Sequence, residues 1–351
     1  MTRALTVSID AMGGDAGPGV VVSALLKTTQ RHSDVRFVLH GDEAQLTPLL
    51  ARHATLKSRC AIEHAPDRVS MEDKPSHVLR RGKDTSMWHT IQCVKDGKAD
   101  VAVSAGNTGA LMAVSMFGLG IIEGISRPAI ATIWPTLKGQ TVVLDVGANV
   151  SATEEQLVDF AVMGEAFAHV LLGLARPTVG ILNVGSEEQK GNDGVKGAAQ
   201  ILRNSNLPMA FHGFVEGDDI AKGTVDVVVT DGFTGNIALK TAEGTARLVG
   251  SYLRQSLKRS FFSRLGALVA SGALNALRRK LDPRAQNGGI FLGLNGVVVK
   301  SHGSADAVGF ASAIDTAIDM ARADINARIT ADRSRITAES AESAGARASE
   351  L

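Results

Sequence analysis

The residues that could carry chemistry lie in short polar loops that follow apolar runs of the chain. Lys190 stands beside a glycine in one of these loops, with Asn192 two residues further on. A lysine in this setting can act as a point charge on a phosphate group. In another loop His302 follows Lys300 by two residues, and its imidazole could be a general acid or a hydrogen-bond donor to phosphate. These residue types favour chemistry on an anion.

Two further loops combine hydrogen-bonding side chains with the start of an expected helix. Gly106, Asn107 and Thr108 offer several neutral donors with little bulk, which suits phosphate or an oxyanion, although simple capping of the helix explains the same pattern. In the other loop Asp231 could orient a donor, while Asn236 could cap the helix or hydrogen-bond a reacting carbonyl. Both loops therefore carry a structural and a functional interpretation.

Gly13 and Gly14 belong to the first glycine-rich loop, which could present backbone N–H groups to an anion. Asp10 and Asp15 place negative charge where a pyrophosphate would lie, and the G-x-G-x-x-G pattern is absent, so a nicotinamide dinucleotide is disfavoured. The P-loop pattern, the G-x-S-x-G elbow and zinc-ligand spacing are also missing. The sequence predicts no cofactor and no metal.

The composition of the chain limits its partners and its surroundings. Its 351 residues carry a net charge of +1, which gives no overall field to select nucleic acid or membrane. Two cysteines, Cys60 and Cys93, provide no disulfide framework and suit a reducing compartment. The apolar stretch from Ala110 to Ile122 is shorter than the ~20 residues that span a bilayer. We therefore expect a cytoplasmic protein that does not bind nucleic acid.

The elements that position the loops are short β-branched runs that alternate with helical patterns, which predicts an α/β fold with a mostly parallel sheet covered on both faces. Loops after the carboxyl ends of parallel strands form a ligand crevice, so we expect these loops to converge. Residues 1–329 are predicted to form one catalytic unit. The expected strands are 5–9, 35–39, 101–103, 141–144, 179–182, 225–229 and 296–299.

Two segments depart from this pattern. Residues 254–284 are strongly basic, and their apolar residues repeat at helical spacing, which predicts a protruding hairpin of two short amphipathic helices. Residues 330–351 are rich in Ala, Ser, Glu and Arg, which is typical of a polar, disordered tail.

Read together, the loops resemble the bacterial phosphate acyltransferase family of phospholipid synthesis, whose members act on acyl-acyl-carrier-protein and phosphate. The resemblance implies an isocitrate/isopropylmalate-dehydrogenase-like α/β fold and a homodimer. It also implies transfer of a fatty acyl group from acyl carrier protein to inorganic phosphate, after which a membrane acyltransferase passes the group to glycerol 3-phosphate. The matching segments are residues 10–15, 104–110, 144–149, 230–236 and 294–306.

Phosphate is itself an oxygen nucleophile at neutral pH, so direct attack on the thioester needs no serine or cysteine intermediate. On this hypothesis Lys190, Lys300 and His302 bind phosphate or the oxyanion. Asn107 and Asn236 orient the carbonyl, and Asp231 fixes a neighbouring group.

The basic hairpin fits the same hypothesis, because acyl carrier protein is acidic and basic residues could steer it. Its apolar faces could cover the acyl chain, pair across a dimer or rest on a membrane surface, giving peripheral membrane association. Alternative activities are an acetyl/butyryl-CoA phosphotransacylase and a nicotinamide-dependent decarboxylating dehydrogenase; a non-catalytic binder of lipid or carrier protein is a third class. The hairpin contact residues are predicted to be Arg264, Leu265, Leu268, Arg278, Arg279 and Lys280.

Overall fold

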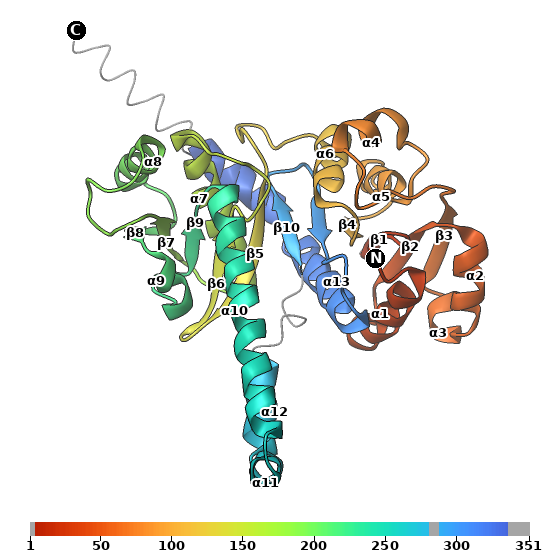
Figure 1. The fold of residues 1–351 in the computed structure, drawn as a ribbon. Coiled ribbons are helices and arrows are strands. Elements are labelled where there is room, and N and C mark those ends of the chain that lie inside the picture. The colour runs from red at the N-terminus through yellow and green to blue at the C-terminus, as the bar shows by residue number, and fades with distance from the viewer. Residues whose placement is uncertain (1–3, 281–287, 336–351) are drawn as a thin grey trace.

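The computed structural model describes residues 4–280 and 288–335, which form an eleven-stranded sheet with helices packed against it (Figure 1). The central strands are buried on both faces: Val101 and Val103 belong to one hydrophobic core, and Ala102 between them belongs to the other. This agrees with their continuous apolar sequence and confirms the predicted α/β class.

The strands are β1 (Thr6–Asp10), β2 (Arg36–Gly41), β3 (Cys60–His64), β4 (Val101–Ser104), β5 (Ala129–Thr136), β6 (Gly139–Leu144), β7 (Thr178–Leu182), β8 (Ala210–Val215), β9 (Val227–Val229), β10 (Gly289–Leu292) and β11 (Val297–Lys300). The helices are α1 (Pro18–Arg31), α2 (Glu43–Ala51), α3 (Ala54–Lys57), α4 (Pro75–Arg81), α5 (Ser86–Lys95), α6 (Thr108–Leu119), α7 (Glu154–Leu172), α8 (Asp193–Asn204), α9 (Gly217–Lys222), α10 (Gly232–Lys258), α11 (Phe261–Val269), α12 (Ser271–Lys280) and α13 (Ala307–Arg322).

The sheet consists of two parallel groups that run in opposite directions. Strand order is β3-β2-β1-β4-β11-β10-β5-β6-β9-β7-β8. Strands β1, β2, β3, β4 and β11 pair in parallel, as do β6, β9, β7 and β8. Antiparallel pairing of β11 with β10, of β10 with β5 and of β5 with β6 reverses the direction between the groups.

This reversal corrects the expectation that all the loops follow strands ending at one edge. The loops after β1, β4 and β11 lie at one edge of the sheet, whereas those after β6, β7 and β9 lie at the other. The expectation was wrong because it lacked β5 and β10, the two strands whose antiparallel pairing causes the reversal.

Helix α10 connects the body of the molecule to a projection. It has 27 residues, which corresponds to a length of about 40 Å. In Figure 1 it runs down out of the body, with α11 at the tip and α12 returning alongside it. The predicted protruding hairpin is therefore present, although α10 itself supplies its first arm as far as Lys258.

The folded unit continues beyond the predicted boundary at residue 329. Residues 325–335 are helical, and ion pairs tie this segment to α7. Arg328 contacts Glu165 at 2.9 Å, and Arg333 contacts Asp159 at 2.9 Å. The prediction of a disordered tail was wrong for residues 330–335, because charged side chains in this segment pair with buried acids; residues 336–351 lie outside the described residues.

Candidate functional site

Asp10, at the end of β1, is the centre of a buried hydrogen-bond cluster. Its side chain is 1% exposed and accepts hydrogen bonds from Ser86 Oγ and Ser104 Oγ, each at 2.6 Å. Burial raises the pKa of Asp10, and the two serine hydrogen bonds oppose that effect. Asp10 therefore ties the ends of β1 and β4 to the first turn of α5.

Glycines allow the loops after β1, β4 and β11 to come into contact. A β-carbon at Gly13 would lie 2.5 Å from Asp10 Oδ2 and 2.9 Å from the backbone nitrogen of Gly106. Gly14 has φ of 85°, and a β-carbon there would lie 2.9 Å from the carbonyl oxygen of Gly303. The N–H of Asp15 donates to that same carbonyl at 2.8 Å. Three predicted loops therefore form one cluster, which we call the first loop group: residues 10–15, 104–108 and 300–304.

Lys300 and His302 are the titratable groups on the β11 side of the first loop group. Lys300 is 8% exposed, and its Nζ donates to the carbonyl oxygens of Ser301 and, at 3.3 Å, Ala105. Burial lowers the pKa of Lys300 to about 8. The ring of His302 contacts Ser304 Oγ through Nδ1 at 2.9 Å. Partial burial, and then the charge of Lys240, lower the pKa of His302.

Asn107 joins the first loop group to the chain segment before α4. Its Oδ1 accepts the N–H of Ala110 at 3.0 Å and so caps α6, as the capping interpretation required. Its Nδ2 donates to the carbonyl oxygens of Met71 and Asp73 at 2.7 and 3.2 Å. The neighbouring Thr108 is exposed. Asn107 therefore fixes the segment of residues 71–73 against the first loop group.

Residues 145–149, which follow β6, and residues 230–236, which follow β9, form a second loop group. Asp145 is fully buried and accepts hydrogen bonds from the backbone N–H groups of Ile130, Gly147, Ala148 and Asn149. A β-carbon at Gly232 would lie 2.6 Å from Asp145 Oδ2, so the first turn of α10 packs closely on this loop.

Asp231 and Asn236 belong to this second group. Asp231 caps α10 by accepting from the N–H and Oγ1 of Thr234 at 2.8 and 2.9 Å. Asn236 is exposed, and its side chain lies beside Gly147, where a β-carbon would be 3.7 Å from Asn236 Cγ. Asn236 therefore has a side chain available to a substrate.

One face of α10 leads from the second loop group to the first. Asn236, Lys240, Glu243 and Arg247 are spaced four, three and four residues apart, so they share this face. Lys240 lowers the pKa of both Lys300 and His302, while Glu243 raises that of His302. Glu243 also contacts Lys240 and Arg247 at 3.0 and 3.3 Å. The α10 stripe, as we call these four residues, therefore runs from Gly147 to the charges around His302.

Lys190 and Asn192 follow β7, on the same edge as the second loop group. Lys190 is exposed, with its Nζ 3.9 Å from Glu187, and Asn192 caps α8 by accepting the N–H of Val195 at 2.9 Å. Among the described residues, no hydrogen bond or ion pair joins Lys190 to the first loop group. The catalytic role of Lys190 stays a prediction.

Sequence reasoning missed several residues that the fold brings to the site. Ser86 lies in a segment with no glycine-rich signal, and Lys240 and Arg247 are ordinary helix residues until α10 is placed beside the 300–304 loop. Asp10 was read only as a charge that disfavours pyrophosphate. Helical spacing from Asn236 was the one signal that could have indicated Lys240 and Arg247.

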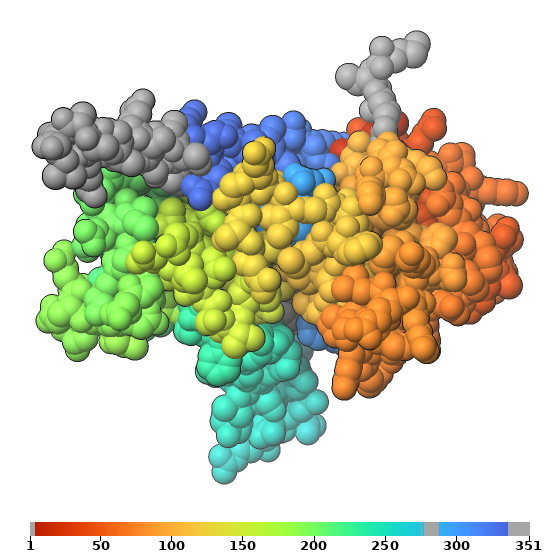
Figure 2. Space-filling view, turned by 90° about the horizontal axis from the view of Figure 1, so that it is seen from above, coloured from red at the N-terminus to blue at the C-terminus, as the bar shows by residue number. Residues whose placement is uncertain are grey.

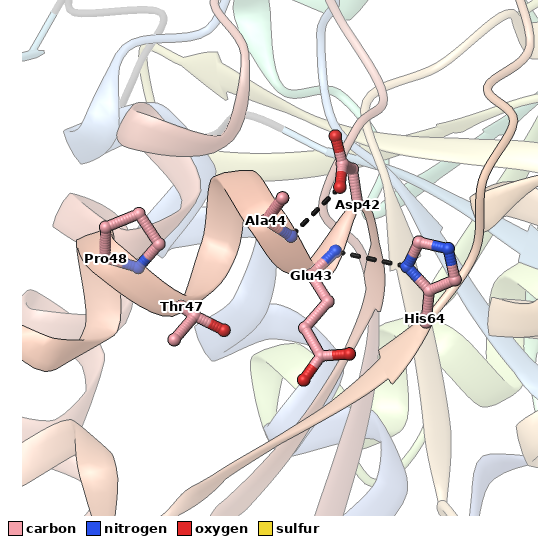
Figure 3. A pocket seen from close by; sticks show the side chains of 6 residues that line it. All are labelled: Asp42, Glu43, Ala44, Thr47, Pro48 and His64. Carbon is pink, nitrogen blue, oxygen red and sulfur yellow. Dashed lines mark hydrogen bonds between the residues drawn. The ribbon is translucent and has the colours of Figure 1, made fainter.

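Two surface cavities lie near the ends of β2 and β3. One, of about 580 Å³, is drawn in Figure 3; Asp42 accepts the N–H of Ala44 there, and the N–H of Glu43 donates to His64 Nδ1 at 3.3 Å. Its polar groups therefore serve the start of α2. The other, of about 490 Å³, is lined by Met12 of the first loop group and by Arg68.

The projection exposes large apolar side chains. Phe261, Phe262, Leu265, Leu268 and Val269 of α11 are between 50% and 84% exposed. Arg264 is also exposed, whereas the side chains of Arg278, Arg279 and Lys280 lie outside the described residues. Within residues 4–280 and 288–335, no helix has the length and apolar character required to cross a membrane.

Comparison with solved structures supports the fold. A phosphotransacetylase from Streptococcus pyogenes matches with a TM-score of 0.62 at 17% identity, over 92% of this chain and 95% of that one. One from Staphylococcus aureus matches with a TM-score of 0.57 at 17% identity, over 92% and 94%. At this identity the likeness shows the fold alone.

Comparison with sequences shows the family. Residues 5–328 match the model described as "Fatty acid synthesis protein". The phosphate acyltransferase of Parvibaculum lavamentivorans is 58% identical over 338 residues, covering 96% of this chain and 94% of that protein. That of Xanthobacter autotrophicus is 57% identical over 330 residues, covering 94% and 93%. The predicted resemblance is confirmed: the chain belongs to the phosphate acyltransferase family.

Proposed function

We propose that the protein transfers a fatty acyl group from acyl carrier protein to inorganic phosphate, giving acyl phosphate for phospholipid synthesis. Family membership gives the reaction class, and the charges around the first loop group fit the substrate. Lys300, His302 and Lys240 place positive charge or hydrogen-bond donors where a phosphate could lie between α10 and the loops. That grouping of two lysines and a histidine is the observation that carries the proposal.

The proposed reaction needs no covalent enzyme intermediate. A phosphate oxygen attacks the thioester carbonyl carbon, a C–O bond forms, and the carbonyl oxygen gains negative charge. The C–S bond then breaks, and the carrier's sulfur leaves as thiolate, which takes up a proton to become thiol. Lys300, Lys240 and His302 hold phosphate, and Asn236 orients the carbonyl; such positioning can contribute several kcal/mol, about 7–11 in favourable cases.

Incubation with radiolabelled phosphate and acyl-acyl-carrier-protein tests this function, with acyl phosphate trapped as the hydroxamate. We expect labelled acyl phosphate from the carrier-protein thioester and much less from acyl-CoA. A preference for acyl-CoA would identify a phosphotransacylase instead. An acyl group found on a protein side chain during turnover would contradict direct attack by phosphate.

We also propose one role for α10 and one for the tip of the projection. Phe233, Ile237, Leu248 and Tyr252 of α10 are 51–61% exposed and repeat at helical spacing, which suits pairing with a second copy of the chain. The apolar residues of α11 at the tip suit contact with a lipid surface, which would associate a cytoplasmic enzyme peripherally with the membrane. A membrane acyltransferase that uses the acyl phosphate would be the next enzyme.

A further inference from the structure

Helix α4 and its flanks carry a dense group of exposed cations. Between residues 74 and 83 there are four lysines or arginines and one histidine, and no aspartate or glutamate. All five of these side chains belong to exposed residues. We call them the α4 cationic segment: Lys74, His77, Arg80, Arg81 and Lys83.

None of these five side chains has an ion pair or hydrogen bond with any residue that the structure describes. Cations elsewhere on the surface commonly do: Lys222 contacts Asp218 at 2.6 Å, and Arg322 contacts Asp34 at 2.9 Å. Three acids flank the segment, Glu72 and Asp73 before it and Asp84 after it, but among the described residues none of them forms an ion pair with it. The segment therefore presents to solvent positively charged side chains that are not held in ion pairs.

This segment begins at the candidate site. A β-carbon at Gly109, in the first turn of α6, would lie 3.1 Å from Cγ of Pro75, the first residue of α4. Asn107 holds the carbonyl oxygens of Met71 and Asp73, just before α4, at 2.7 and 3.2 Å. The side chain of Met71 also lies next to the 300–304 loop, because a β-carbon at Gly303 would be 3.3 Å from Met71 Cε.

The tip of the projection is less well placed to deliver an acyl group. Arg264 follows the end of α10 at Lys258, which lies about 16 Å along the helix from Arg247, the last residue of the α10 stripe. The seven residues of α4 span only about 10 Å from their contact with α6. Figure 2 shows the orange surface and the teal projection as separate parts of the molecule, and in Figure 1 α4 lies at the top of the body whereas α11 lies at the bottom.

We propose that the acidic carrier protein docks on the α4 cationic segment, so that its acylated arm enters the site beside Met71 and Asn107. This proposal rests on the proposed function for the identity of the partner. Charge complementarity carries it: an acidic partner would meet on this segment cations that form no ion pair with any residue of the described chain. The cavity of about 490 Å³ between Met12 and Arg68 leaves open space next to the same loops.

The test separates docking from chemistry. Binding is measured by fluorescence anisotropy with a labelled carrier protein that lacks its prosthetic arm, so the active site contributes nothing. Arg80→Glu/Arg81→Glu should raise the Kd by about tenfold or more, and the wild-type Kd should rise with salt. Arg80→Lys/Arg81→Lys should bind nearly as the wild type does, and Lys57→Glu, on exposed α3, is the neutral control.

Turnover then uses two thioesters. The charge-reversed variant should lose kcat/KM with acyl-acyl-carrier-protein by about the same factor and keep wild-type turnover with acyl-pantetheine, which has no carrier protein. Lys74→Glu/Lys83→Glu repeats the test should the first pair fail to fold.

Each failure has a distinct meaning. Unchanged binding in both charge-reversed variants, or loss of binding on Arg264→Glu alone, would overturn docking on α4. A wild-type protein that binds no carrier protein would overturn it as well. A wild-type protein that binds carrier protein but forms no acyl phosphate would instead refute the proposed function and leave the docking surface supported.

Discussion

At the scale of single residues, Lys300 determines how the site should respond to pH. Its pKa of about 8 lies below the usual value for lysine, so its positive charge is present below pH 8 and lost above it. If Lys300 holds phosphate, KM for phosphate should rise by up to about tenfold per pH unit above pH 8.

Steady-state kinetics between pH 7 and 9.5 would measure this rise. Lys300→Arg keeps its charge throughout that range, so the rise should disappear in this variant. The same alkaline rise in Lys300→Arg would show that another group is responsible.

Asn236 and Lys190 were predicted as substrate ligands in two separate loops. Loss of one transition-state donor typically lowers kcat by about 10²–10³-fold, so Asn236→Ala and Lys190→Ala should each fall by about that factor while remaining folded. Lys196→Ala is the matched control, because Lys196 pairs with Asp193 at 3.1 Å on α8. Near-wild-type turnover in Lys190→Ala would confine the site to α10 and the first loop group.

Residue types predicted the helix caps only in part. Asn107 was expected as a possible cap, and it accepts the N–H of Ala110 in the first turn of α6. In the next loop the predicted cap was Asn236, but Asp231 caps α10, and the cap of α8 by Asn192 was not predicted. Asn and Asp are both common at helix starts, so a loop that contains several of them does not show which one is the cap. The link between Ser86 and Asp10 joins residues 76 positions apart, and no local pattern encodes it.

At the scale of elements, the projection should bind lipid through α11. Leu265→Glu/Leu268→Glu places two carboxylates on the exposed apolar face, and we expect it to abolish co-sedimentation with liposomes without unfolding the body. Leu137→Glu is the matched control, since Leu137 is 88% exposed at the turn between β5 and β6. Unchanged sedimentation of the α11 variant would assign this face to contact with a second chain.

The C-terminal helical segment makes stability depend on pH through Glu165. Burial raises the pKa of Glu165 to about 7, although Arg328 opposes the shift. Between its ordinary value and pH 7 the folded state then binds more protons than the unfolded state, so this group makes stability fall as pH rises through that window.

Glu165→Gln removes the titration and should flatten this pH dependence. Urea unfolding at pH 5 and pH 8 would measure it, with the exposed Glu123→Gln as the control. A slope as steep as that of the wild type would show that other groups cause the dependence.

At the scale of the whole molecule, the exposed apolar face of α10 predicts a dimer. Leu248→Glu/Tyr252→Glu should give half the mass of the wild type in sedimentation equilibrium, because two carboxylates from each chain would have to be buried in the contact. A wild type that sediments as a monomer at micromolar concentration would contradict the proposal.

The sequence predicted seven of the eleven strands but not how they are oriented. Runs such as residues 141–144 and 296–299 became β6 and β11 because a doubly buried strand needs continuous apolar residues. Strand β5 contains Trp134 and Pro135, and the apolar residues 290–292 of β10 lie between glycines on both sides, so neither was predicted as a strand. Since these two strands set the relative direction of the two groups, the sequence could not predict which loops would meet.

The position of β11 in the sheet has a consequence for biosynthesis. Although β10 and β11 come late in the chain, they lie at the centre of the sheet, between β4 and β5. While a ribosome is still making residue 280, the two flanking groups of strands exist but have no partner to join them. Such pairing over long sequence separations is slow to form. Until β10 and β11 have been synthesised, the nascent chain therefore has two unpaired strand edges, at β4 and at β5. A chain that terminates before these strands would keep both edges unpaired and would be prone to aggregate.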